Sequence, residues 1–183
     1  MYQQPSPQTG VTLIELLIVI TIGAILMGVG LPSYKYITTS YRISGEINAL
    51  LGDIQFARAE AVREGQNVTL CVANSTGSDC ATNATAWQSG WIVFSDPSSG
   101  KTTGSNAALV LRRQAAFTGG DTFDDSTNGF LIFGREGLVT GFAGGTIPLH
   151  DPSANPNWTR CLQITSVGAA AVVQHTTTGA SCT

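Results

Sequence analysis

One stretch of 21 residues, positions 11–31, contains a single charged residue, Glu15. As a helix rising 1.5 Å per residue it would be roughly 30 Å long, which is the thickness of the hydrocarbon core of a bilayer. The stretch is too long and begins too far along the chain for an ordinary secretory signal, and no Ala-x-Ala cleavage site follows it. Buried helices of soluble domains seldom have an apolar run of this length. We therefore expect a membrane anchor.

Helical periodicity resumes after Pro32, which closes the apolar stretch. Apolar residues recur at spacings of three and four while charged residues occupy the other face, and Gly65 is a suitable stop. The pattern predicts one helix over residues 11–64, in which residues 32–64 form an amphipathic continuation of the anchor. The apolar stripe of this half consists of Ile47, Leu50, Leu51, Ile54, Ala57 and Ala61.

Beyond residue 65 the sequence changes to short β-like segments separated by Gly, Asn, Asp and Ser. The segments are joined by loops without the helical patterns that parallel crossovers need, so the sheet should be mainly antiparallel. The fold class expected is α+β, with the long helix packed on a globular β domain over residues 65–183. The segments are NVTLCVA, GWIVFSD, ALVLRR, GFLIFG, GLVT, TIPLHD, RCLQITS and AAAVVQH.

All four cysteines, Cys71, Cys80, Cys161 and Cys182, lie in this β-rich part. An even number of cysteines beyond a membrane anchor favours two disulfides in an oxidising compartment. Of the three possible connectivities, Cys71–Cys80 with Cys161–Cys182 is favoured because each pair closes a short loop. A zinc site is disfavoured because the chain has no C-x-x-C pair and no histidine close to a cysteine pair.

Composition and motifs argue against several functions. The net charge is −3 and only 11% of residues are charged, which does not indicate a nucleic-acid partner. The chain has no G-x-S-x-G or H-E-x-x-H motif and no histidine with an identifiable nucleophile nearby, so we expect neither an enzyme nor a cofactor.

Two polar loops could be taken for ligand sites. Gly100-Lys101-Thr102 follows a strand, but a phosphate-binding loop would need glycine where the chain has Ser95, so we expect a hairpin loop. Asp121, Asp124 and Asp125 do not have the spacing of an EF-hand. A solvated loop is the simpler interpretation, and an irregular calcium site remains open.

The segment G-V-T-L-I-E-L-L-I-V-I, which begins at Gly10, resembles the class III signal of type IV prepilins and type II secretion pseudopilins. In that family a membrane peptidase cuts after the glycine and methylates the new N-terminus. The resemblance implies a leader over residues 1–10, cleavage between Gly10 and Val11, and N-methylation of Val11. Glu15 would become the fifth mature residue, and Pro32 matches a family proline. Val11 departs from the usual Phe, and the leader lacks Lys and Arg.

Glu15 also raises a physical question. A carboxylate at the centre of a membrane helix costs about 2.5–3.5 kcal/mol on insertion scales and less near an end, and residues 11–31 contain no cation. After cleavage the nearest cation is an α-amino group, either that of Val11 or that of a neighbouring chain. The family is thought to use the second pairing in filament assembly. Snorkelling to the membrane surface would be the simpler interpretation of Glu15 alone, but the whole pattern that begins at Gly10 favours the pairing.

A second resemblance covers the β-rich part. The helix end A-R-A-E-A at residues 57–61, the strand G-W-I-V-F-S-D at residues 90–96 and the hairpin FLIFGREGLV are similar to the GspH/FimT group of minor pilins and minor pseudopilins. Trp87, Trp91 and Val93 should pack the sheet on the apolar stripe of the helix.

FimT-like members of this group bind DNA through a basic Gly-Arg-x-Arg loop. Here Gly168 is followed by Ala169, Ala170 and Ala171, so the cations that would neutralise phosphates are missing. A DNA-uptake pilin is therefore disfavoured, and we expect no nucleic-acid partner.

The resemblance implies a structural and assembly component of a type IV pilus, a minor pilin in a priming or tip complex. Its partners would be other minor and major pilin subunits, the prepilin peptidase and the inner-membrane assembly platform. The chain would cross the bacterial inner membrane once, with its C-terminal domain in the periplasm, until it enters the pilus. The alternative is a minor pseudopilin of a type II secretion system.

Overall fold

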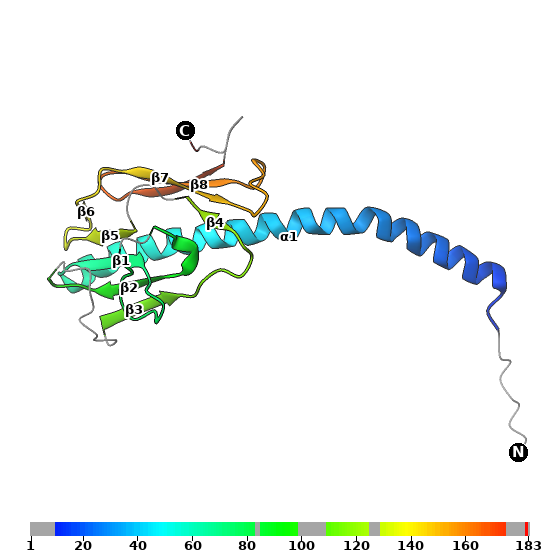
Figure 1. Cartoon of the computed structure of the whole chain (residues 1–183), viewed down its shortest axis with the longest axis horizontal. Coiled ribbons are helices and arrows are strands. Elements are labelled where there is room, and N and C mark those ends of the chain that lie inside the picture. Colours follow the sequence, from blue (N-terminus) through cyan, green and yellow to red (C-terminus); the bar gives the residue numbers. More distant parts are fainter. Residues whose placement is uncertain (1–9, 83–84, 99–108, 125–128, 175–181, 183) are drawn as a thin grey trace, which may run out of the picture. The chain divides into compact units, whose positions relative to one another are not determined.

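The computed structural model describes residues 10–82, 85–98, 109–124, 129–174 and 182. The chain divides into two compact units, Met1–Thr38 and Thr39–Thr183. The helix α1, Leu13–Glu64, contributes residues to both units (Figure 1). The single helix predicted for residues 11–64 is thus confirmed, with its start two residues later than expected.

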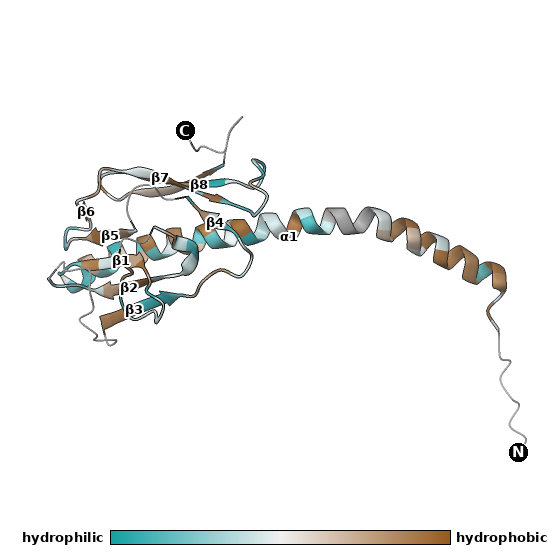
Figure 2. Cartoon of the chain, viewed as in Figure 1, coloured by the Kyte–Doolittle hydropathy of each residue, from teal (hydrophilic) through white to brown (hydrophobic). Residues whose placement is uncertain are grey.

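In the first unit, the turns of α1 that follow Leu13 are strongly apolar, as the brown ribbon in Figure 2 shows. Most of these side chains are exposed in the isolated chain. Across the described residues, no helix reaches the combination of length and hydropathy required to span a membrane.

In the second unit, five strands form one antiparallel sheet in the order β3-β2-β1-β5-β6. The outer strand β3 joins β2 with an irregularity between Val93 and Phe94. The strands are β1 (Val68–Val72), β2 (Trp91–Ser95), β3 (Val110–Gln114), β5 (Phe130–Phe133) and β6 (Val139–Thr140).

A second antiparallel sheet has the order β4-β7-β8-β9. All eight expected strands are present, but β4 and the short 3₁₀ helix η1, Trp87–Ser89, were not expected. Strand β4 has only two residues, too few for an alternating pattern, and forms by pairing with β7. The strands are β4 (Thr122–Phe123), β7 (Gly145–His150), β8 (Arg160–Ile164) and β9 (Ala170–Gln174).

The two sheets share one hydrophobic core with the C-terminal half of α1, around which they gather in Figure 1. The predicted stripe is correct except at Leu51, which is only partly buried, while Ile43 extends the stripe by one turn. The buried residues of α1 are Ile43, Ile47, Leu50, Ile54, Ala57 and Ala61.

Trp87, Trp91 and Val93 are completely buried in this core, as predicted. The Trp91 ring meets Phe117 edge to face at 5.6 Å, and its Nε1 donates a hydrogen bond of 2.8 Å to Asp53 Oδ2 on α1. Gly90 precedes it at φ +96°, where a Cβ would lie 2.5 Å from the Gln114 carbonyl oxygen. Glycine at this position therefore lets β2 enter the core beside β3.

Both disulfides have the connectivity favoured by the loop lengths. Cys71 of β1 is bonded to Cys80 in the following loop, and Cys161 of β8 is bonded to Cys182 near the C-terminus. Cys71 forms a small secondary core with Ile92 and Phe94, and Cys80 packs against this core. The disulfides thus attach the loop that contains Cys80 and the C-terminal Cys182 to interior strands of the two sheets.

Candidate functional site

The expected cleavage site lies in an exposed segment just before α1. Gly10 and Val11 precede the first helical residue, and 73% of the Val11 surface is exposed. Glu15 follows in the first turn of the helix and is also exposed. Leader residues 1–9 lie outside the described part. Cleavage and methylation here remain predictions.

Glu15 has a local partner that the sequence analysis missed. Its backbone N–H donates a hydrogen bond of 3.3 Å to Thr12 Oγ1, so Thr12 caps the start of α1. Ser or Thr followed three residues later by Glu or Gln is a capping box, and the T-L-I-E sequence contains that signal. A carboxylate near the positive end of a helix dipole is also favourable. Glu15 can therefore stabilise the helix start, and its pairing with an amine remains a prediction.

The N-terminal turns of α1 present apolar side chains on every side. A helix of this kind needs an apolar environment, either lipid or other helices. Pro32 lies within α1. Side chains exposed by half or more are Leu13, Ile14, Leu16, Ile18, Val19, Ile20, Ile22, Ile25, Leu26 and Met27.

Arg58, the arginine of the A-R-A-E-A motif, joins α1 to turns of both sheets. Its Nε donates to the Gly137 carbonyl oxygen and its Nη2 to the Val167 carbonyl oxygen, both at 2.7 Å. Gly137 has φ +74°, and a Cβ there would lie 3.0 Å from Val62 Cγ2. The arginine thus holds the β5–β6 turn and the β8–β9 turn on one helix face.

We expect the substitution Arg58→Ala to lower the free energy of unfolding by about 2 kcal/mol, because two charged hydrogen bonds are lost. Chemical denaturation of the full chain in detergent micelles measures this change. The control is Arg135→Ala, which removes only an exposed pair with Glu136 and should change stability by less than about 1 kcal/mol. Equal midpoints for Arg58→Ala and wild type would contradict the role of Arg58.

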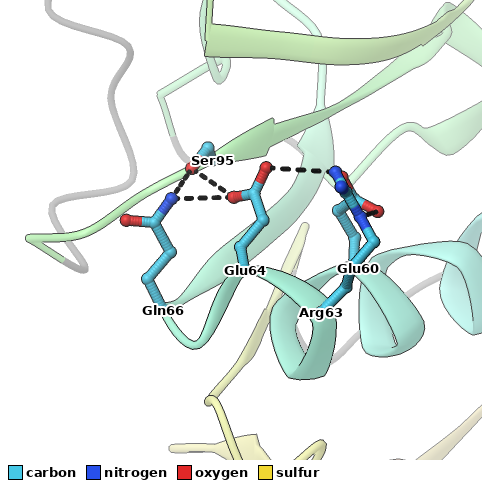
Figure 3. A network of polar contacts seen from close by, with 5 residues as sticks. All are labelled: Glu60, Arg63, Glu64, Gln66 and Ser95. Carbon is cyan, nitrogen blue, oxygen red and sulfur yellow. Dashed lines mark hydrogen bonds and ion pairs between the residues drawn. The ribbon is translucent and has the colours of Figure 1, made fainter.

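The end of α1 is tied to β2 by a polar network shown in Figure 3. Ser95 Oγ donates to Glu64 Oε2 at 2.8 Å, and Gln66 Nε2 donates to Glu64 Oε2 and to Ser95 Oγ, each at 2.7 Å. Arg63 pairs with Glu60, and this hydrogen bond lowers the pKa of Glu60. Glu64 and Gln66 therefore fix where the helix meets the sheet, while Glu60 pairs with Arg63 within the helix.

Other arginines of the β domain also have local partners. Arg112 Nη1 lies 2.9 Å from Asp53 Oδ1, and its guanidinium carbon lies 3.8 Å from the centre of the Phe56 ring.

In the β8–β9 turn, Gly168 has φ +80°, and a Cβ there would lie 2.4 Å from Val139 Cγ2. This glycine serves the close packing of the turn on the first sheet.

The aspartates considered for calcium point to other partners. Both Asp121 carboxylate oxygens accept hydrogen bonds from Arg42, at 2.5 and 2.7 Å, and Asp124 Oδ2 lies 3.1 Å from His150 Nε2. Asp125 and the Gly100-Lys101-Thr102 loop lie outside the described residues. Within the described ranges, no group of three or more His, Cys, Asp or Glu residues could hold a metal ion.

Comparisons with solved structures give the fold independently of sequence motifs. The type IV minor pilin FimU of Pseudomonas aeruginosa matches in two crystal forms. One has a TM-score of 0.57 at 18% identity over 73% of this chain and 89% of that chain. The other has a TM-score of 0.54 at 19% identity over 71% and 91%. The minor pseudopilin EpsH of the Vibrio cholerae type 2 secretion system has a TM-score of 0.46 at 9% identity over 69% and 92%.

Two family models match this sequence, one over its N-terminal region and one over the rest of the helix and the β domain. Curated protein sequences give no significant match. The prokaryotic N-terminal methylation motif matches residues 5–31, and the family model for type II transport protein GspH matches residues 46–168. Because that model spans more than half of the chain, this protein belongs to the GspH family.

Proposed function

We propose that the chain is a minor pilin, a structural and assembly component of a type IV pilus that acts in a priming or tip complex. The observation that carries this proposal is the succession of an N-terminal methylation motif and a GspH-family region in one chain. The likeness of the fold to the minor pilin FimU supports a pilus as the setting.

The chemistry of the N-terminus suggests how such a subunit would assemble. The prepilin peptidase removes residues 1–10 and methylates Val11, which creates an α-amine close to Glu15. Residues 11–31 hold the chain in the inner membrane, with the β domain in the periplasm. During assembly the exposed apolar side chains of α1 exchange lipid for the helices of other pilin subunits, guided by the assembly platform. The role inferred is structural, without catalysis.

The experiment that tests this proposal compares the deletion strain with a strain complemented by the full gene. We expect the deletion to lose surface pili in the sheared fraction while protein secretion is unchanged. The complementing protein should appear in that fraction together with other pilins. Normal piliation of the deletion strain would contradict the proposal.

A second function is favoured by the family description itself, which names a type II transport protein. In that case the chain would be a minor pseudopilin of a type II secretion system. The same pair of strains distinguishes the two functions, because loss of secretion with normal pili supports the pseudopilin.

A further inference from the structure

A cluster of charged side chains joins α1 to the segment that precedes β4. Arg42 donates two hydrogen bonds to Asp121, from Nε to Oδ2 at 2.5 Å and from Nη2 to Oδ1 at 2.7 Å. The Asp121 side chain is completely buried. A Cβ at Gly119 would lie 2.5 Å from Arg42 Nε, so any other residue at this position would require the Arg42 side chain to shift. The arginine therefore neutralises one buried carboxylate.

A second carboxylate, that of Glu46, lies beside Asp121. Glu46 follows Arg42 by one helical turn, and its Oε2 is buried without a hydrogen-bond partner among the described residues. A protonated Glu46 carboxyl would be a hydrogen-bond donor for the neighbouring Asp121 carboxylate. The cluster thus contains two adjacent carboxyl groups, those of Glu46 and Asp121, but only one cation, that of Arg42. One of the two carboxyl groups can therefore bind a proton.

The remaining charged groups near the cluster lie at the ends of β4 and β7. Asp151 acts on Arg42 electrostatically, and Asp124 pairs with His150. Burial works to raise the pKa of Asp151, but hydrogen bonds from Ser153 and Asn155 outweigh it and lower that pKa. Asp151 therefore stays ionised, which leaves Glu46 as the group that can take up the proton.

The environment of Glu46 favours its protonated form. Burial is the largest cause that raises the pKa of Glu46 from 4.5 to about 7. The hydrogen bond that its protonated form can donate to Asp121 and the charge of Asp121 raise it further, and Arg42 only partly opposes them. The buried Oε2 atom and the adjacent carboxylate give this shift a geometric basis.

We propose that the protonated Glu46 carboxyl donates a hydrogen bond to Asp121, and that loss of this proton loosens the contact between α1 and the segment 119–121, which makes this contact a pH-sensitive latch. The segment lies between two anchors, because Phe117 and Phe123 both pack on Trp91. Opening is therefore confined to the residues between these rings and to the pairing of β4 with β7.

The direction of the pH dependence follows from the raised pKa. A group that holds its proton more tightly in the closed form stabilises that form fully below its ordinary pKa. The stabilisation declines as pH rises from about 4.5 to about 7, where Glu46 becomes charged in the closed form too. Above this range two carboxylates face one another across a single arginine, and the latch is weakest.

Hydrogen–deuterium exchange of the full chain in detergent micelles tests the latch at a series of pH values. After correction for intrinsic exchange rates, the protection of amides 120–122 should fall roughly tenfold between about pH 5 and about pH 8. The variant Glu46→Gln carries a permanent N–H donor for Asp121, so its protection should stay high and constant within roughly twofold. A titration of the Glu46 carboxyl carbon by NMR should give a midpoint near pH 7.

The matched control is Glu136→Gln, which alters a carboxylate paired with Arg135 outside the cluster and should keep the wild-type profile. Constant protection in wild type would overturn the proposal. So would a Glu46→Gln profile that keeps the wild-type slope, because the slope would then come from another group.

Discussion

Trp91→Ala is expected to lower the free energy of unfolding by about 4 kcal/mol, a large fraction of the roughly 5–15 kcal/mol that stabilises a typical domain. The Trp91 side chain is completely buried between α1 and the first sheet, and it forms edge-to-face contacts with Trp87, Phe117 and Phe123. Truncation would leave a cavity and remove the donor that faces Asp53 Oδ2. A buried carboxylate oxygen without its donor adds to the loss.

Chemical denaturation followed by far-ultraviolet circular dichroism measures this effect without relying on tryptophan fluorescence. Trp91→Phe retains an aromatic ring but lacks the N–H, so it should fall between wild type and Trp91→Ala. The exposed Val167→Ala serves as a control and should change stability by less than about 1 kcal/mol. A midpoint for Trp91→Ala equal to that of wild type would show that the core is not organised around this ring.

Glu15→Gln is expected to leave the chain in the membrane but to prevent its incorporation into filaments. Glutamine can occupy the third helical position of a capping box, so the helix start is preserved. It carries no charge, so it cannot neutralise an α-amine beside it. The substitution therefore separates the pairing of charges from the local capping seen in the structure.

Thr12→Val is the complementary control, since it removes the capping hydroxyl and keeps the carboxylate. Immunoblots of sheared filaments and of membranes should show Thr12→Val in both fractions and Glu15→Gln in membranes alone. The N-terminus of each variant is checked by mass spectrometry, so that a change in processing is not mistaken for a change in assembly. Filaments that contain Glu15→Gln at the wild-type level would show that capping is the main role of Glu15.

The helix and the strands could be predicted because their patterns are local. Alternation in NVTLCVA and the spacing of Ile47, Leu50 and Ile54 report directly on which side chains face the core. Strand β4 was not predicted, because its two residues form a strand only through their pairing with β7. A pattern of period two needs more residues than that to be visible.

The contacts that tie the molecule together were harder to anticipate. Arg58 and Gly137 are 79 residues apart, as are Arg42 and Asp121, so no local pattern links them. The latter pair also changes the interpretation of the aspartate-rich loop, where Asp121 is an ion-pair partner of the helix. The capping of α1 by Thr12, in contrast, was visible in the sequence as T-x-x-E.

Cleavage between Gly10 and Val11 should create the mature N-terminus of this protein. Intact-mass and N-terminal peptide mass spectrometry of the full chain, extracted from membranes of the native host, tests it most directly. The expected chain begins at Val11 and carries a methyl group on its α-amine. A chain that still begins at Met1, or at any residue other than Val11, would contradict it.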